Sequence, residues 1–569
     1  MRYHLLACDY DGTLATDGRV AEATLKALRK ASESGRKLVL VTGRELADLL
    51  QVFPDLSLFD WVVAENGGLL YRPASREEFP LAPEPPEALV ALLRERGVVP
   101  LSVGRTIVST WEPNETAVLG AIRELGLELQ VIFNKGAVMV LPASINKRSG
   151  LEAALERLSL SAHNCVGVGD AENDHAFLSI CEYAVAVKNA LPALKESADW
   201  VTQAARGAGV CELIEQLLSD DLLSRDTRPD RRHVALGAFD DGAEMSIAAF
   251  GPVGLVAGSS GSGKSTATMA LLERLAARDY QVCIIDPEGD HEAFASAVVL
   301  GTAEQPPDIE QLLKILAQPR THAVVNLLAI KIADRPQFFL SLWTRLSQVR
   351  AATGRPHWIA VDEAHHVLDA TFEPMQLALP AELASTLFIT VHPERLHSAL
   401  LAHVDFALGV GSECEATLGA LARALGRDPP EVLTRPEQPG QVLFWERGRS
   451  SARRVTLAAG RSAQRRHRRK YAHGELGPDK SFYFRGAESK LNLRAQNLVV
   501  FNDIGAGVDD ETWLYHLVNG DYSSWIRDAI KDEELAARVG EVERETELSA
   551  NESRERIRML IENVYTAPA

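Results

Sequence analysis

The sequence lacks cysteine pairs with a recognisable spacing, long apolar runs and an N-terminal targeting pattern. Six cysteines are scattered through 569 residues without CxxC or zinc-finger spacing, which is typical of reduced, buried thiols in a cytosolic protein. No apolar run reaches about 18 residues, and no basic start precedes a long apolar centre near the N-terminus. We therefore expect a cytoplasmic protein without a membrane partner.

The sequence also lacks an excess of basic residues. Its formal charge is −18, with 60 lysines and arginines against 78 acidic residues. A surface built mainly to coat nucleic acid would carry the opposite sign, although a local basic patch can still bind it. Nucleic acid is therefore a possible partner that the composition does not favour.

Short β-rich runs alternate with helical patterns through most of the chain. The runs include LLACD, KLVLVT, NCVGVGD, GLVAG, QVCIID and WIAVDEA. This alternation predicts α/β domains with parallel sheets, and a chain of this length should form about three to five units. The charged segment 222–233 is interpreted as a linker, and a second break comes near Arg461.

The stretch CDYDGTL places Asp9 and Asp11 at the end of the first strand. A strand-end carboxylate projects from the edge where open α/β sheets bind ligands. Attack of a carboxylate on a phosphate dianion meets charge repulsion, which a bridging divalent cation relieves. The second aspartate can then protonate the leaving oxygen and afterwards activate water.

Three further motifs follow in order: VTGR with Thr42, INKRSGLEAAL with Lys147, and VGVGDAENDHAF with Asp170, Asn173 and Asp174. Together with DxDGT they resemble the haloacid dehalogenase superfamily, in its Cof-like phosphatase branch, over about residues 1–220. The resemblance implies a Rossmannoid domain over 1–221 that depends on Mg²⁺. It also implies the following roles: Asp9 as nucleophile and metal ligand, Asp11 as acid/base and carbonyl ligand of the metal, Thr42 and Lys147 as phosphate ligands, Asp170 as metal ligand, and Asp174 in the metal shell with Asn173 nearby.

The interval between Thr42 and Lys147 has room for an inserted domain. Residues 82–143 alternate in a pattern that predicts a small α+β cap. By family analogy such a cap covers the site and selects a small phosphorylated substrate, and its size resembles that of phosphoglycolate- and sugar-phosphatase members. The sequence leaves the substrate itself open.

A second phosphate motif, GSSGSGKST, lies between an apolar strand and a helical pattern. Backbone N–H groups of such a loop hold phosphates, Lys264 would reach the β- and γ-phosphates, and Ser265 would ligate Mg²⁺. In WIAVDEAHH, Asp362 would join the magnesium shell and Glu363 would face an attacking water, as in an ATPase. The predicted nucleotide-binding residues are Gly258, Gly261, Gly263, Lys264, Ser265 and Thr266. The preference for ATP over GTP is left open.

With IIDPEGDHEAF and LFITVHPERL, this region is similar to the HerA and FtsK branch of P-loop motors over about residues 230–460. Where that branch often has a sensor glutamine, this chain offers Thr390 and His392. Arg395 is interpreted as a surface arginine rather than an arginine finger, and the pair His365–His366 as polar packing with the rings pointing apart. The resemblance implies a P-loop ATPase domain over 234–460 and allows a homo-oligomer through it.

Residues 461–569 are interpreted as a basic linker followed by a helical module, with LVVF as the last strand-like run. The basic run, Arg465 to Lys470, either binds a nucleic-acid backbone or serves as a solvated linker. Trp513, Tyr515, Trp525 and Ile526 are expected to form a small core or a docking face. Three functions stay open: a metabolite phosphatase fused to an ATPase, a nucleic-acid motor whose phosphatase acts on nucleotides or polynucleotide ends, or a phosphatase whose P-loop domain is regulatory, with ATP binding altering assembly or access to the cap.

Overall fold

The computed structural model describes the chain except for residues 226–231, 260, 293, 295, 370–382, 439, 459–475, 477–479, 488–489, 531, 546–547 and 566–569. The chain divides into two compact units, and the first comprises Met1–His291 and Ser296–Ala458. The second contains the C-terminal module. The basic run that begins at Arg465 and part of the expected linker lie outside the described residues.

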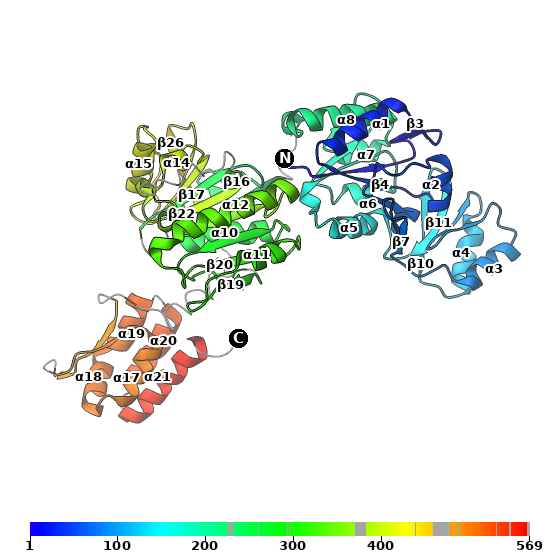
Figure 1. Cartoon of the computed structure of the whole chain (residues 1–569). Coiled ribbons are helices and arrows are strands. Elements are labelled where there is room, and N and C mark those ends of the chain that lie inside the picture. The colour runs from blue at the N-terminus through cyan, green and yellow to red at the C-terminus, as the bar shows by residue number, and fades with distance from the viewer. Residues whose placement is uncertain are drawn as a thin grey trace. The chain divides into compact units, whose positions relative to one another are not determined.

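The N-terminal sheet has the strand order β14-β13-β12-β1-β4-β5-β6-β7, shown in blue to green in Figure 1. Pairing is parallel from β14 to β5 and antiparallel at β6 and β7. Its strands are β1 Leu5–Asp9, β4 Lys37–Val41, β5 Trp61–Ala64, β6 Leu69–Arg72, β7 Glu77–Pro80, β12 Cys165–Gly169, β13 Tyr183–Ala186 and β14 Trp200–Val201. Its helices are α1 Glu22–Glu33, α2 Leu46–Val52, α5 Lys147–Arg157, α6 Asp174–Leu178, α7 Pro192–Ser197 and α8 Arg206–Asp220.

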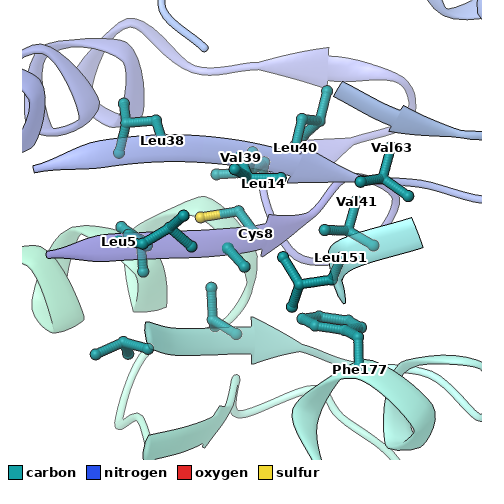
Figure 2. Packing of buried hydrophobic residues seen from close by; sticks show 14 of the residues in the cluster. Leu5, Cys8, Leu14, Leu38, Val39, Leu40, Val41, Val63, Leu151 and Phe177 are labelled. Atoms are coloured by element: carbon teal, nitrogen blue, oxygen red, sulfur yellow. The ribbon is translucent and has the colours of Figure 1, made fainter. Parts of the chain in front are cut away.

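Continuous apolar runs form the central strands because helices cover both faces of this sheet. Every residue of β1 is buried, and Leu151 of α5 and Phe177 of α6 pack near β1 and β4 in Figure 2. The core therefore fixes the carboxyl ends of the central strands, where Asp9 and Asp170 emerge. All six cysteines are free, and five of them are buried.

A small sheet with two helices is inserted between β7 and α5. Its strand order is β10-β11-β9-β8, and all its pairings are antiparallel. The elements are α3 Glu87–Glu95, β8 Ser102–Val103, β9 Val108–Trp111, α4 Glu115–Glu124, β10 Leu129–Asn134 and β11 Ala137–Pro142. We call this insertion the cap.

The second α/β sheet has the order β16-β15-β26-β25-β23-β17-β22-β21-β18-β20-β19, with β24 beside β26. Its strands are β15 His233–Phe239, β16 Glu244–Ala248, β17 Val253–Ala257, β18 Val282–Asp286, β19 Val298–Leu300, β20 Ala323–Asn326, β21 Trp358–Val361, β22 Thr386–Thr390, β23 Phe406–Val410, β24 Glu431–Val432, β25 Gln441–Glu446 and β26 Ser451–Leu457. Its helices include α10 Lys264–Ala276, α11 Ile309–Leu316, α12 Arg335–Thr353, α14 Ser398–Leu401 and α15 Cys414–Ala424. The strands from β23 to β19 pair in parallel.

The C-terminal unit is mainly helical, as predicted. It contains β27 Phe482–Phe484, β28 Leu493–Ala495, α17 Leu498–Gly507, α18 Asp510–Asn519, α19 Asp521–Trp525, a π turn Ile526–Ile530, α20 Glu533–Arg544 and α21 Ala550–Tyr565. Trp513, Trp525 and Ile526 are buried in its core, whereas Tyr515 is 41% exposed. The α/β class with a helical C-terminal module is thus confirmed. Among the described residues, no helix has the length and apolar character that a membrane crossing requires.

One local prediction in this unit is wrong. LVVF begins helix α17, because the Asn497 side chain accepts a hydrogen bond from the Val500 N–H and caps the helix. Before this helix, Phe482–Phe484 pairs antiparallel with Leu493–Ala495.

Candidate active site and nucleotide site

Asp9, the last residue of β1, lies in a buried cluster of charges. The Lys147 ammonium donates to the Asp9 carboxylate at 2.6 Å and to the Asp174 carboxylate at 2.6 Å. Lys147 is the first residue of α5, whose start is fixed by a capping box between Asn146 and Ser149. Local helix capping therefore delivers a lysine from α5 to the nucleophile candidate on β1.

Burial dominates the electrostatics of this cluster. Burial and, second, the nearby Asp174 carboxylate raise the pKa of Asp9 to about 7 against the opposing effect of Lys147. Burial by itself would lower the pKa of Lys147, but the charges of Asp174 and Asp9 raise it above its ordinary value. Lys147 thus stays charged and partly neutralises two buried carboxylates.

Asp170 and Asp174 follow β12 and form the other side of the cluster. Ligand atoms of Asp9, Asp170 and Asp174 all lie within 4.8 Å of one another, and all three residues are buried. Both oxygens of Asp174 already have partners, because one pairs with Lys147 and the other accepts the N–H groups of Asp170 and Ala171 at 2.8 and 2.9 Å. The three carboxylates thus lie close enough to share one cation, and the Asp174 side chain is held by Lys147 and by the backbone after β12.

The donor set fits a hard divalent cation. Mg²⁺ prefers carboxylate and carbonyl oxygens, and the Asp11 carbonyl and the Asp170 carboxylate both lie within hydrogen-bond distance of one ammonium group. A cationic group already bridges these oxygens, because the Lys135 ammonium lies 2.8 Å from the Asp11 carbonyl and 2.9 Å from Asp170 Oδ2. Asp9 and Asp170, with the Asp11 carbonyl, are the residues that would hold Mg²⁺.

The Asp11 side chain is held by a residue of the VTGR motif. Arg44 donates to both oxygens of Asp11, at 2.6 and 2.8 Å, and to Asp48 at 2.6 Å. Thr42 follows β4, is buried, and accepts a hydrogen bond from the Arg44 N–H at 3.1 Å. Asn173 donates to the Asn66 side chain at 3.0 Å, beside the same loops.

Two residues of this site were missed at the level of sequence. In the VTGR motif, the sequence assigned a role to the threonine but none to Arg44. The bidentate pairing of Arg44 with Asp11 joins residues 33 positions apart, so no local pattern indicates it. Lys135 lies in the Asn-Lys-Gly turn between β10 and β11. This sequence predicts a tight turn, but it does not indicate which groups the lysine side chain contacts. The structure brings the five predicted residues Asp9, Asp11, Thr42, Lys147 and Asp170 to the end of one sheet.

The second phosphate motif forms a loop between β17 and α10. Gly261 and Gly263 have positive φ angles of 74° and 99°, and a Cβ at Gly258 would lie 2.2 Å from the Val410 carbonyl oxygen. These positions therefore require glycine. Lys264, Ser265 and Thr266 form the first turn of α10, and the Lys264 ammonium lies 3.2 Å from the Ser259 carbonyl oxygen.

Asp362 and Glu363 directly follow β21, in the same sheet as the phosphate loop. His291 Nε2 lies 2.6 Å from Asp362 Oδ2, and the His291 N–H donates to Asp286 at 2.7 Å. Burial raises the pKa of Glu363 to about 7, with the Asp362 charge adding to the effect. Glu363 adopts a left-handed conformation with φ 38°, so its backbone is strained at the predicted water-activating position.

Thr390 ends β22 and contacts His365 and His392. Its hydroxyl lies 3.1 Å from His365 Nδ1 and accepts the His392 N–H at 2.9 Å. The prediction that the rings of His365 and His366 point apart is wrong, since their centroids are 4.3 Å apart. The turn after Glu363 folds them together. Arg395 pairs with Asp369 at 2.7 Å and is half exposed.

Two family models match separate parts of the chain. The model described as haloacid dehalogenase-like hydrolase matches residues 6–106 and 123–214. The model described as the central domain of helicase HerA matches residues 254–343. The chain thus joins a haloacid dehalogenase-like hydrolase region to a region that matches the HerA central domain.

Curated relatives match the first region. The chain is 32% identical over 223 residues to phosphoglycolate phosphatase of Methanothermobacter thermautotrophicus, covering 37% of this chain and 98% of that protein. It is 29% identical over 221 residues to phosphoglycolate phosphatase 2 of Saccharolobus solfataricus, covering 38% and 92%. A solved haloacid dehalogenase-like hydrolase from Bacteroides thetaiotaomicron shares 20% identity and covers 38% of this chain and 99% of its own, with a TM-score of 0.34.

Proposed function

The chain belongs to the haloacid dehalogenase-like hydrolase family, and we propose that its N-terminal domain hydrolyses a small phosphomonoester through a phosphorylated Asp9. The observation that carries this proposal is the position of Asp9: buried, paired with Lys147 at 2.6 Å and close to Asp170. Relatives named phosphoglycolate phosphatase support a substrate of the phosphoglycolate or sugar-phosphate type.

The first half-reaction forms a bond between an Asp9 oxygen and phosphorus while the ester P–O bond breaks. Asp11 gives its proton to the leaving alkoxide, and Thr42 and Lys147 hold phosphoryl oxygens. Mg²⁺, when bound at Asp9 and Asp170, would cancel the repulsion between carboxylate and phosphate dianion.

The second half-reaction releases phosphate. Asp11, now ionised, takes a proton from water as the water oxygen bonds to phosphorus and the bond to Asp9 breaks. Arg44 orients the ionised Asp11 for this second step through both of its carboxylate oxygens. The net reaction consumes one water and returns both aspartates to their initial states.

Replacement of Asp9 by Asn tests this proposal. The variant should release no phosphate from p-nitrophenyl phosphate in the presence of Mg²⁺, while ATP hydrolysis by the second domain continues. Unchanged turnover of the ester in this variant would remove the proposal.

For the second domain we propose ATP binding and hydrolysis. The phosphate loop, Lys264 and the pair Asp362–Glu363 lie at one end of a parallel sheet, as a P-loop ATPase requires. Mg²⁺, when bound at Ser265 and Asp362, would neutralise charge on the phosphates. Isothermal titration with ATP and GTP, followed by a phosphate-release assay, distinguishes binding from hydrolysis and identifies the preferred nucleotide.

The match to the HerA central domain favours one alternative, a nucleic-acid-associated ATPase whose phosphatase acts on nucleotides or polynucleotide ends. This alternative predicts DNA binding that weakens steeply with salt and an ATPase rate that DNA stimulates. Absence of DNA binding even at low salt would exclude it. Light scattering with and without ATP tests assembly of a homo-oligomer.

A further inference from the structure

The cap places one lysine directly into the phosphatase site. Lys135 occupies the turn between β10 and β11 with φ 49°, followed by Gly136 with φ 85°. Its ammonium group lies 2.8 Å from the Asp11 carbonyl oxygen and 2.9 and 3.1 Å from the two oxygens of Asp170. A cap residue thus contacts the loop that follows β1 and the loop that follows β12.

The approach of Lys135 depends on a glycine in the DxDGT motif. Gly12 has φ 90°, and a Cβ at this position would lie 2.8 Å from the Lys135 ammonium and 2.3 Å from Asp170 Oδ2. A side chain at position 12 would therefore displace both groups. Lys135 of the cap therefore packs closely against Gly12 of the catalytic core.

The other cations of the site are engaged by carboxylates of the catalytic core. Lys147 pairs with Asp9 and Asp174, and Arg44 pairs with Asp11 and with Asp48 outside the site. The carboxylate partner of Lys135 is Asp170. The Lys135 side chain is also 45% exposed, whereas that of Lys147 is 1% exposed. Lys135 is thus a cation at the solvent side of the site.

Lys135 and a divalent cation need the same oxygens. The residues that fit Mg²⁺ include the Asp11 carbonyl and the Asp170 carboxylate, which are the two groups that Lys135 contacts. With Mg²⁺ on these oxygens, like-charge repulsion would move the ammonium group away, while the β10–β11 turn would keep the Lys135 backbone at the site. The displaced ammonium would then require another anion. The bound substrate can supply one through its phosphoryl oxygens or, in a hydroxy-acid ester, through a carboxylate on the leaving group.

We propose that Lys135 binds a carboxylate on the leaving group of the substrate and so selects small phosphorylated hydroxy acids over phosphate esters with uncharged ends. This inference rests on the proposed phosphatase function and narrows its substrate class. A flexible lysine suits the role, because its ammonium can swing from Asp170 to a substrate carboxylate without movement of the turn. Sugar phosphates, whose remaining groups are hydroxyls, lack the carboxylate that this contact requires.

A matched pair of substrates tests the proposal on the full-length chain. 2-Phosphoglycolate and 2-hydroxyethyl phosphate have the same length and differ in the carboxylate. Lys135→Met should lower kcat/KM for phosphoglycolate by about ten- to a hundredfold, mainly through KM, and should change the value for hydroxyethyl phosphate far less. Lys135→Arg should restore part of the discrimination. Arg123→Met, which removes an exposed charge from the same cap, should leave it intact.

Calorimetric titration of Mg²⁺ without substrate gives a second measurement that does not depend on turnover. Removal of the competing ammonium in Lys135→Met should tighten Mg²⁺ binding several-fold. Weaker Mg²⁺ binding, or an equal loss of kcat/KM for both esters, would overturn the proposal, because Lys135 would then support the metal site itself. Unchanged discrimination would overturn it as well.

Asp9→Asn separates this failure from failure of the proposed function. If Asp9→Asn abolishes hydrolysis of both esters and Lys135→Met alters neither selectively, the specificity role alone is wrong. If Asp9→Asn continues to hydrolyse both esters, the phosphatase assignment itself is wrong.

Discussion

Two nitrogens of the Arg44 guanidinium donate hydrogen bonds to the Asp11 carboxylate, at 2.6 and 2.8 Å, so that the predicted acid/base has a fixed orientation beside the nucleophile. The bidentate geometry is specific to a guanidinium, whose planar fork matches a carboxylate. It links the motif after β4 to the motif after β1.

Arg44→Met should therefore impair the step that needs a proton. Turnover of an alkyl phosphate should fall by about ten- to a hundredfold, whereas p-nitrophenyl phosphate, whose leaving group needs no proton, should be affected less in its first step. Asp48→Asn removes the exposed outer partner of Arg44 and serves as the control, with a small effect on either ester. Equal losses for both esters in a pre-steady-state assay would contradict the orienting role.

Lys147→Met should destabilise the N-terminal domain as well as inactivate it. The change leaves Asp9 and Asp174 buried beside each other without their cation, which costs about 3–5 kcal/mol. Thermal melting without Mg²⁺, which could replace the lost charge, should show an early transition lower by more than about 5 °C. Lys26→Met, at an exposed position of α1, should melt like the wild type. An unshifted transition in Lys147→Met would show that the buried pair contributes little.

Glu363→Gln should separate nucleotide binding from hydrolysis. Loss of the general base at the end of β21 should lower ATP hydrolysis by about a hundredfold or more. ATP binding should persist, because the phosphate loop and Lys264 are unchanged. Phosphatase turnover should stay at the wild-type value in the same preparation. Retention of full ATPase activity would assign the water-activating role to another residue.

His4 should make the N-terminal domain sensitive to acid. Burial lowers the pKa of His4 from 6.5 to about 4, so the folded chain keeps it neutral. Unfolded chains take up this proton below pH 6.5, so the contribution of His4 to stability is fully present above pH 6.5 and is lost as the pH falls towards 4. The N-terminal amino group, Asp221 and Arg36 are the charges that face it.

His4→Gln should remove this pH-dependent loss of stability, which amounts to about 2–3 kcal/mol as the pH approaches 4. Melting temperatures of the two proteins at pH 7 and pH 5 measure it. The wild type should lose more stability than His4→Gln on acidification. Parallel losses would place the acid-sensitive groups elsewhere.

The sequence carried enough information to locate the strand-end residues. Buried parallel strands are continuous apolar runs, so Asp9 and Asp170 were predictable at strand ends, and Lys147 and Lys264 at helix starts. Motif order then assembled these residues into two sites.

Contacts that depend on tertiary packing could not be predicted in this way. Lys135 reaches Asp170 across 35 positions and Asp11 across 124, and no periodic pattern encodes that distance. In the C-terminal unit, the capping side chain of Asn497 starts a helix at the apolar run LVVF, which the sequence pattern alone predicts as a strand.

Asp11→Asn with p-nitrophenyl phosphate separates phosphorylation of Asp9 from hydrolysis of the phosphorylated residue. Nitrophenolate leaves without a proton, but the phosphoryl group on Asp9 can be hydrolysed only when a base activates water. We expect a rapid burst of nitrophenolate, about equal to the enzyme concentration, followed by slow turnover. After an acid quench, the peptide that contains Asp9 should carry phosphate. A linear time course with no phosphate on Asp9 would exclude a phosphorylated Asp9 intermediate.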